Sequence, residues 1–363
     1  MTKGEVRRLF FEVLEIEPAR RSGFLESCGA STEVQGAVLT LLRHDSGGDS
    51  FLEQAVAHEL STPILQGQRF GAYQLGELLG RGGMDAVFKA DRIDGELSQV
   101  VAIKIVERGW LAPQAMERFR QERQILAGLV HPNIEQLLDG GTREDGLPNL
   151  VMEYVDGQRL DEYCAQHHLG IAGRLRVFLP LCDAVDYAHR KLVVHRDLKP
   201  SNVLVTAEGA PKLLDFGVAK AMDPGAGSLT QTLVLTPDFA SPEQVRGTEV
   251  TTATDVYGLG AVLYHLTTGQ PPHPVHDLSP RALERAICEV GPARPSLHRA
   301  DLKGDLENIL LKALHPEPAD RYASARELAD DIERYLEHRP VLATPPRWWY
   351  RMRRFGQRHA PVR

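Results

Sequence analysis

Two short stretches of the sequence concentrate polar side chains that could transfer a phosphoryl group. The first runs from Val193 to Val205 (VVHRDLKPSNVLV) and the second from Lys212 to Lys220 (KLLDFGVAK). Phosphoryl transfer needs a carboxylate to accept the proton of the incoming hydroxyl, a cation for the developing phosphate charge, and oxygen ligands for magnesium. The residues that supply these groups are, in chain order, Asp197, Lys199, Asn202 and Asp215.

Several elements must position these side chains. The polar residues of the first stretch fall between two short runs of β-branched residues, which predicts a loop between two strands. A stripe of apolar residues predicts a structural helix over residues 174–192, directly before this loop. Another apolar helix is predicted over residues 251–269, with the charge of Asp255 near its start. Three further helices are predicted around residues 281–290, 305–314 and 325–337.

Nearer the N-terminus, the stretch from Tyr73 to Ala90 alternates and is rich in glycine, which predicts two antiparallel strands joined by a flexible turn. Glycines in that turn let backbone amides approach phosphate oxygens with no side chain in the way. They are Gly80, Gly82 and Gly83. A further strand is predicted from Val100 to Val106, and it carries Lys104 in an otherwise apolar run. A buried lysine without a partner is costly, so Lys104 is predicted to face anions.

The polar residues of the two stretches occur together with the wordings Asn-Val-Leu-Val at 202–205 and Ser-Pro-Glu-Gln at 241–244. On these motifs the sequence resembles the protein kinase superfamily, and it is most similar to the bacterial eukaryotic-like (Hanks-type) serine/threonine protein kinases. The resemblance covers residues 70–338. It implies an α+β, two-lobed fold, with a small antiparallel β lobe that contains one main helix and a larger helical lobe.

Around this fold, the pattern predicts an N-terminal appendage of three short amphipathic helices, a polar linker and a basic tail. The predicted boundaries are 1–45 for the appendage, 46–69 for the linker, 70–155 for the N-lobe, 156–340 for the C-lobe and 341–363 for the tail.

The resemblance also implies a role for each polar residue. Asp197 would be the base, Lys199 would stabilise the transferring phosphoryl group, and Lys104 would hold the α and β phosphates of ATP. Asn202 and Asp215 would hold Mg2+, with Mn2+ as the alternative ion. The partner of Lys104 would be Glu122 in a helical stretch, with Glu117 as its rival. The alternative is that this stretch is a solvated helix face.

The run from Asn149 to Gly157 is apolar and then polar, which is typical of a strand that leads into an interlobe hinge. The resemblance makes Met152 the gatekeeper and places the backbone of Glu153 and Val155 at the adenine edge. The apolar sandwich around the adenine would consist of Val87, Ala102 and Leu204, each of which could equally belong to the core.

A long loop rich in glycine, serine and threonine lies between Asp215 and Glu243, and its composition predicts mobility. Arg196 is suited to pair with a phosphate on this loop through a charge-assisted contact. The candidate regulatory residues are Arg196, the acceptors Thr230 and Thr232, and Thr236, which matches the threonine that bonds to the catalytic residues in serine/threonine kinases. By resemblance, Asp255 steadies the catalytic loop, and Glu243 pairs with Arg321.

Composition limits the other function classes. The 363-residue chain has a net charge of −7 and a sequence pI near 6.1, which gives no indication of nucleic-acid binding. Its four cysteines are far apart in sequence, which argues against a disulfide scaffold or a zinc site and favours the cytoplasm. The N-terminus has no signal-peptide pattern, and no run of 18 apolar residues occurs.

The tail beyond Ala343 has six arginines and the sequence Trp348, Trp349, Tyr350. This composition suits the edge of an anionic bilayer, and a disordered basic tail is the equal alternative. By resemblance, the chain could be the cytoplasmic portion of a membrane-anchored kinase. A homodimer also stays open.

The resulting hypothesis is a serine/threonine protein kinase that acts on protein substrates with Mg-ATP and is regulated by autophosphorylation of its loop. One alternative is a weakly active or inactive pseudokinase that serves as a signalling scaffold. Another is a small-molecule phosphotransferase of the aminoglycoside kinase type. Asp85 departs from the family pattern because it stands where the third glycine of the loop is expected. Its carboxylate either repels the phosphates of ATP or turns into solvent.

Overall fold

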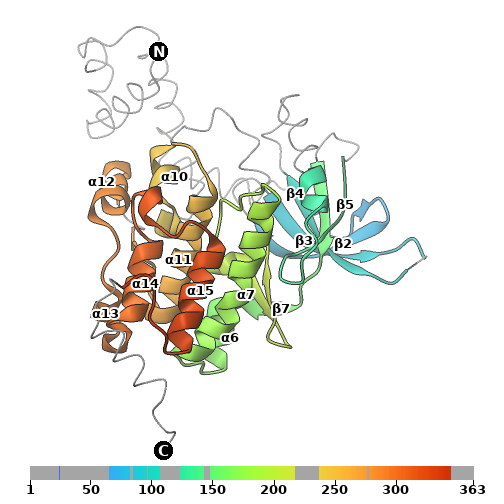
Figure 1. The fold of residues 1–363 in the computed structure, drawn as a ribbon. Helices are drawn as coiled ribbons and strands as arrows, with labels where there is room; N and C mark the ends of the chain where they lie inside the picture. The colour runs from blue at the N-terminus through green and yellow to red at the C-terminus, as the bar shows by residue number, and fades with distance from the viewer. Residues whose placement is uncertain are drawn as a thin grey trace, which may run out of the picture.

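The structure is a computed structural model, and it describes residues 24, 65–81, 85–95, 97–106, 123–142, 148–216, 237–275 and 278–344. These residues form a β-sheet lobe and a larger helical lobe (Figure 1). The predicted α+β, two-lobed fold is therefore confirmed. Apart from Phe24, the predicted N-terminal appendage lies outside the described residues.

The first lobe is built on a six-stranded antiparallel sheet with the order β1-β2-β3-β4-β6-β5. Its strands are β1 (Arg69–Phe70), β2 (Tyr73–Arg81), β3 (Asp85–Arg92), β4 (Val100–Val106), β5 (Leu137–Thr142) and β6 (Pro148–Glu153). The strands predicted from the glycine-rich stretch and from the lysine-bearing run are thus present as β2, β3 and β4.

Side chains alternate between the two faces of this sheet. Phe88 on β3 and Ile103 on β4 are opposite each other in register and are buried in the core of the lobe. Val87 and Lys104 are also opposite each other and share the other face. Register on β3 and β4 therefore directs Lys104 away from the core of the sheet lobe.

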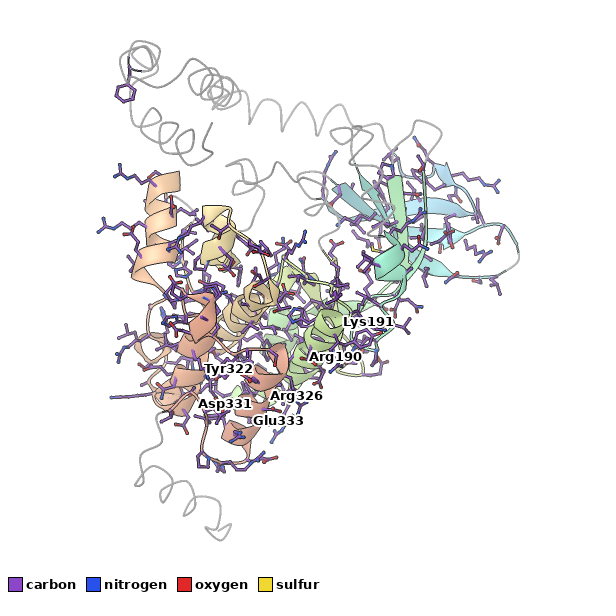
Figure 2. All side chains as sticks on the ribbon, turned by 45° about the horizontal axis from the view of Figure 1, so that its top comes forward. Arg190, Lys191, Tyr322, Arg326, Asp331 and Glu333 are labelled. Atoms are coloured by element: carbon purple, nitrogen blue, oxygen red, sulfur yellow. The ribbon has the colours of Figure 1, made fainter. Side chains whose placement is uncertain are left out.

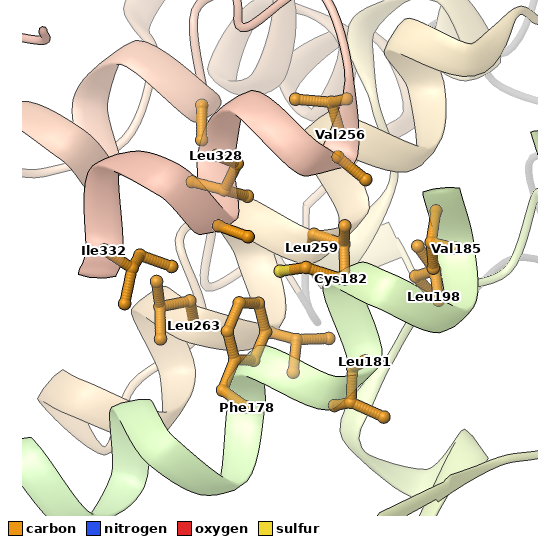
Figure 3. Close-up of a cluster of buried hydrophobic side chains, with 14 of the residues drawn as sticks. Phe178, Leu181, Cys182, Val185, Leu198, Val256, Leu259, Leu263, Leu328 and Ile332 are labelled. Atoms are coloured by element: carbon orange, nitrogen blue, oxygen red, sulfur yellow. The ribbon is translucent and has the colours of Figure 1, made fainter. Parts of the chain in front are cut away.

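The second lobe is mostly helical. Its helices are α6 (Leu160–Gln166), α7 (Ile171–Arg190), α10 (Pro242–Arg246), α11 (Thr252–Thr268), α12 (Pro280–Arg285), α13 (Pro295–His298), α14 (Asp305–Ala313) and α15 (Ala325–Leu336). A small sheet consists of β7 (Gly157–Arg159), β8 (Val203–Thr206) and β9 (Pro211–Leu213). Side chains such as Phe178, Leu263 and Ile332 from α7, α11 and α15 form the buried core of this lobe (Figure 3).

One predicted strand is absent. Residues 193–199 have no regular secondary structure, so the strand predicted before the polar loop is wrong, whereas β8 follows the loop as predicted. After α7 the chain turns at Leu192, which has a φ of 62°. The backbone amide of His195 then bonds to the side chain of Asp255 rather than to a neighbouring strand. Val193 and Val194 therefore belong to an irregular turn and not to a strand.

Gly258 of α11 lets this helix approach the polar loop closely. A β-carbon at Gly258 would lie 2.8 Å from the β-carbon of Leu198, which is too close for two carbon atoms. The helix begins at a capping box on Thr251 and ends at Gly269, whose φ of 77° suits glycine. The position of α11 beside the loop thus depends on a glycine.

The C-terminal end of the described chain is fixed by a buried carboxylate. Asp331 on α15 accepts hydrogen bonds from the backbone amides of Leu342 (2.6 Å) and Ala343 (2.9 Å). The hydroxyl of Tyr322 donates to the same carboxylate at 2.8 Å, and the two side chains lie next to each other in Figure 2. Over the described part of the chain, none of the helices combines the length and apolar character that a membrane span requires.

Candidate active site

The side chain of Asp255, near the start of α11, accepts hydrogen bonds from the backbone of the polar loop. One carboxylate oxygen accepts from the amide of His195 at 2.7 Å, and the other accepts from the amide of Arg196 at 2.9 Å. The Nε2 atom of His189 lies 2.7 Å from the first of these oxygens. These contacts stabilise the left-handed conformation of Arg196, whose φ is 68°.

The loop brings a carboxylate, an ammonium and an amide into contact. The Lys199 ammonium lies 3.0 Å from Oδ2 of Asp197. The Asn202 amide donates to the backbone oxygen of Asp197 at 2.8 Å and reaches its Oδ2 at 3.3 Å. Because these bonds use the nitrogen of the Asn202 amide, its oxygen is the group that remains to bind a cation.

The second polar stretch lies directly beside this loop. The amide of Leu214 donates to the backbone oxygen of Asn202 at 2.8 Å, and the His195 ring contacts the oxygen of Leu214 at 2.9 Å. Burial lowers the pKa of His195, which favours its neutral form, and the ring packs against Phe216. The next residue after Leu214 is Asp215, held at a φ of 55°.

Lys104 reaches Asp215 across the two lobes. Its ammonium lies 2.6 Å from Oδ1 of Asp215 and 2.9 Å from Oδ2 of Asp85. Burial acts to lower the pKa of Lys104, but the two carboxylates outweigh it and raise the pKa above its usual value. Asp85 therefore contacts Lys104, so the alternative that its carboxylate turns into solvent is wrong.

The predicted adenine-contacting residues come from both lobes. Ala102 and Met152 are opposite each other on β4 and β6, and they form one buried cluster with Leu150 against which Val87 packs. Leu204 lies on β8 of the helical lobe, and Val155 follows β6 in the connection between the lobes.

At the end of β6, the side chain of Glu153 binds Lys212 of β9, with nitrogen–oxygen distances of 2.7 and 2.8 Å. This ion pair links the sheet lobe to the helical lobe beside the predicted hinge.

Glu135 was not identified from the sequence. It is a half-buried residue whose carboxylate accepts a long hydrogen bond of 3.4 Å from the amide of Asp215. Burial of the carboxyl group is the main cause that raises the pKa of Glu135 to about 8, and the negative charge of Asp215 acts in the same direction. Together with Asp215, Phe216 and apolar residues such as Met152, it lines a cavity of about 30 Å³. A single acidic residue in the run HPNIEQLL gives no signal that it contacts Asp215.

A buried ion pair anchors the segment that follows the long loop. Arg321 donates to both oxygens of Glu243 at 2.7 and 2.8 Å, and the hydroxyl of Thr254 donates to Glu243 at 2.8 Å. Burial alone would raise the pKa of Glu243, but the Arg321 contacts hold it below its usual value. The structure thus brings together the pair that the resemblance implied.

Several predicted site residues lie outside the described residues. They are Gly82, Gly83, Glu122, Thr230, Thr232 and Thr236, and their roles stay predictions. The remaining glycine of the turn, Gly80, lies at the end of β2, where a β-carbon would meet no atom within 4 Å. That space is compatible with close approach of a ligand to the backbone.

The donor set suits a nucleotide-bound divalent ion. No group of three or more histidine, cysteine or acidic side chains among the described residues could hold a metal ion by itself. Magnesium in nucleotide sites usually takes one or two carboxylates together with phosphate oxygens and water. A carboxylate from Asp215 and an amide oxygen from Asn202 fit that pattern, and Lys104 adds a cation beside them.

Comparison with known proteins agrees with this geometry. The family model of the protein kinase domain matches residues 73–333. A probable serine/threonine-protein kinase of Streptomyces coelicolor is 40% identical over 284 residues, which cover 76% of this chain and 41% of the relative. The serine/threonine-protein kinase PknB of Mycolicibacterium smegmatis is 40% identical over 275 residues, which cover 73% of this chain and 43% of PknB. The chain thus spans about two fifths of the length of these relatives.

Solved structures show the same fold. The PknI kinase domain of Mycobacterium tuberculosis is 28% identical with a TM-score of 0.60, and the match covers 76% of this chain and 99% of that domain. A crystal structure of Rad53 in complex with AMP-PNP is 22% identical with a TM-score of 0.58, and this likeness concerns the fold alone.

Proposed function

The chain belongs to the protein kinase family with a kinase domain of the bacterial serine/threonine type, and we propose that this domain transfers the γ-phosphoryl group of Mg-ATP to protein hydroxyls. The observation that carries the proposal is the contact of Asp197 with both Lys199 and Asn202, on a loop fixed by Asp255. A kinase of this family uses ATP and a divalent metal ion, and the identity of that ion as magnesium is part of the proposal.

Each residue of the loop then has a defined task. Asp197 accepts the proton of the attacking serine or threonine hydroxyl, and Lys199 neutralises charge on the phosphoryl group during transfer. Lys104 binds the α and β phosphates, while Asn202 and Asp215 hold the metal ion. The bound ion would neutralise phosphate charge and align the γ-phosphoryl group with the acceptor.

Nucleotide binding is assigned to the face that the two lobes share. We assign the phosphates to the glycine turn and the adenine to the apolar cluster and the connection between the lobes. The residues in these roles are Gly80, Gly82, Gly83, Val87, Ala102, Met152, Glu153, Val155 and Leu204, with Glu122 as a further partner of Lys104.

The central experiment measures phosphoryl transfer to a generic protein substrate by mass spectrometry. The parent chain with Mg-ATP should phosphorylate serine and threonine residues. Asp197→Asn should abolish transfer and leave the Kd of ATP largely unchanged, because the carboxylate acts on the acceptor hydroxyl. Transfer by this variant at near-parental rates would refute the assignment of the base. No comparison favours the alternative of an inactive scaffold.

We also propose that phosphorylation of the long loop regulates the kinase, at Thr230 or Thr232, with Thr236 favouring hydroxyl acceptors. Support comes from Arg196, whose buried Nε has no hydrogen-bond partner among the described residues. A phosphate could supply that acceptor. Replacing both threonines with alanine should lower activity several-fold. Full activity, with phosphate mapped elsewhere, would exclude this mechanism.

The domain boundaries given above, the cytoplasmic location and the membrane-anchored origin of the chain are likewise proposals. The membrane-anchored origin is supported by the arginines and aromatic residues of the basic tail. Dimer formation stays a prediction that sedimentation of the purified chain can test.

A further inference from the structure

Asp85 is placed beside Lys104 by the pairing of two strands. It is the first residue of β3, where it is opposite Val106, and Val87 is opposite Lys104. Residues two apart on a strand share a face, so Asp85 is the diagonal neighbour of Lys104. Such a diagonal is within reach of a long side chain. The position of Asp85 therefore follows from register and does not depend on a loop conformation.

The contact between them is a partly buried ion pair. The ammonium of Lys104 lies 2.9 Å from Oδ2 of Asp85, and the exposed fractions of the two side chains are 13% and 18%. Salt and water screen such a pair less than a pair on the surface. The same ammonium also binds Asp215, so two carboxylates share one positive charge.

The function proposed above makes a different demand on Lys104. There, the ammonium must donate to phosphate oxygens of ATP. Asp215 remains useful when ATP binds, because it is an oxygen ligand of the metal ion in that proposal. Asp85 has no such task, and its carboxylate is an anion that competes with the phosphates for the same ammonium.

We propose that Asp85 is an affinity-determining residue for the nucleotide: its carboxylate forms an ion pair with the ammonium of Lys104, and the phosphates of ATP must displace this carboxylate to bind the ammonium. This inference rests on the proposed role of Lys104. When the phosphates bind Lys104, the ion pair between Lys104 and Asp85 is lost. The carboxylate of Asp85 then stays near the phosphates and repels them. Both effects weaken the binding of ATP. The effect concerns only the phosphate portion of the nucleotide, because adenosine has no phosphate that could bind Lys104.

The opposite role would give the opposite sign. A carboxylate at the end of the glycine turn could instead act as an additional oxygen ligand for a metal ion on the phosphates. Removing its charge would then weaken binding of the metal–nucleotide complex, whereas removing a competitor strengthens it. The direction of the change in Kd therefore separates the two roles.

The experiment compares the parent with Asp85→Asn, which keeps the shape of the side chain and removes its charge. Calorimetry gives the Kd of a non-hydrolysable ATP analogue with Mg2+, and in parallel the Kd of adenosine. The analogue should bind about ten- to thirtyfold more tightly to the variant, the effect of one unit charge about 8 Å away at an effective dielectric constant of about 20. The Kd of adenosine should not change. Asp85→Ser is a second, smaller variant that should shift the same way.

A matched control comes from the same strand. Asp91 lies on the same face of β3 but is exposed, and in register it is opposite Val100, far along the ladder from Lys104. Asp91→Asn makes the same change in net charge and should leave both Kd values within about twofold of the parent, as expected of a screened surface charge.

Two results would overturn the inference. Equal Kd values for the analogue in Asp85→Asn and the parent would show that Asp85 does not compete, and weaker binding would assign it to the metal. Lys104→Met tests the premise separately, because it should weaken the analogue and not adenosine. If Lys104→Met has no effect, the proposed role of Lys104 fails. If only Asp85→Asn has none, the inference alone fails.

Discussion

At the scale of single residues, His273 shows how burial changes the charge of a side chain. It is 3% exposed, and its Nε2 lies 2.8 Å from the hydroxyl of Tyr257. Burial lowers the pKa of His273 from 6.5 to about 4. The folded protein therefore keeps this imidazole neutral at a pH where the unfolded chain would protonate it.

This difference predicts a loss of stability in acid. Between pH 6.5 and 4 the unfolded chain binds a proton that the folded chain does not, so the free energy of unfolding falls as the pH falls. The full effect below pH 4 is about 3 kcal/mol, at 1.36 kcal/mol per pH unit. Urea unfolding of His273→Gln should show a shallower decline over this range, while His298→Gln, at an exposed histidine, should match the parent. Parallel curves for parent and His273→Gln would contradict the prediction.

The sequence predicted best the site residues that lie close to one another along the chain. Asp197, Lys199 and Asn202 lie within six positions, so their spacing alone indicated a shared site. Glu135 contacts the amide of Asp215 from 80 positions away, and nothing in its neighbourhood in the sequence indicates that contact. Asp85 was recognised as a departure from the family pattern. Its contact with Lys104, however, depends on the register of β3 and β4, which we could not predict from the sequence.

At the scale of elements, α11 carries the residue that shapes the polar loop around Asp197. Both carboxylate oxygens of Asp255 accept backbone amides of that loop. Asp255→Ala would leave these amides without an acceptor and free the loop to shift. A misplacement of about 1 Å at reacting groups can cost about a hundredfold in rate.

We therefore expect Asp255→Ala to lower kcat by about a hundredfold, with little change in the Kd of ATP, because the loop acts on the transferred group. Steady-state kinetics together with calorimetry separates these quantities. Asp301→Asn, at an exposed carboxylate outside the loop, should leave both unchanged. A parental kcat in Asp255→Ala would mean that the loop keeps its shape without the Asp255 carboxylate.

Long periodic elements were the part of the fold that the sequence predicted best. Helices α7 and α11 have long apolar patterns, and both were expected within a few residues of their observed ends. The strand expected at Val193 and Val194 was wrong because β-branched residues also suit an irregular turn. The amide of Val193 bonds to the oxygen of Ala188 at the end of α7. The amide of His195 bonds to the side chain of Asp255, a contact about 60 positions away that local pattern does not reveal.

At the scale of the whole molecule, the first residues of the basic tail, up to Thr344, are fixed to the helical lobe. Asp331 holds the amides of Leu342 and Ala343, and the hydroxyl of Thr344 donates to Asp305 of α14 at 3.1 Å. Figure 1 shows α14 on the side of the helical lobe away from the β-sheet lobe. The tail therefore starts far from the candidate active site between the lobes.

This geometry allows a surface-bound tail to leave the active site accessible. We propose that the six arginines and the aromatic residues beyond Pro345 bind anionic lipid, each basic residue near the surface contributing about 1 kcal/mol. Cosedimentation with vesicles that contain phosphatidylserine should retain the full chain at low salt, release it at high salt, and fail after deletion of residues 345–363. Neutral phosphatidylcholine vesicles are the control. Since the described chain ends at Thr344, away from the polar loop, we expect the shortened chain to keep the parental kcat. Equal retention of both chains on anionic vesicles would assign any membrane contact to another part of the molecule.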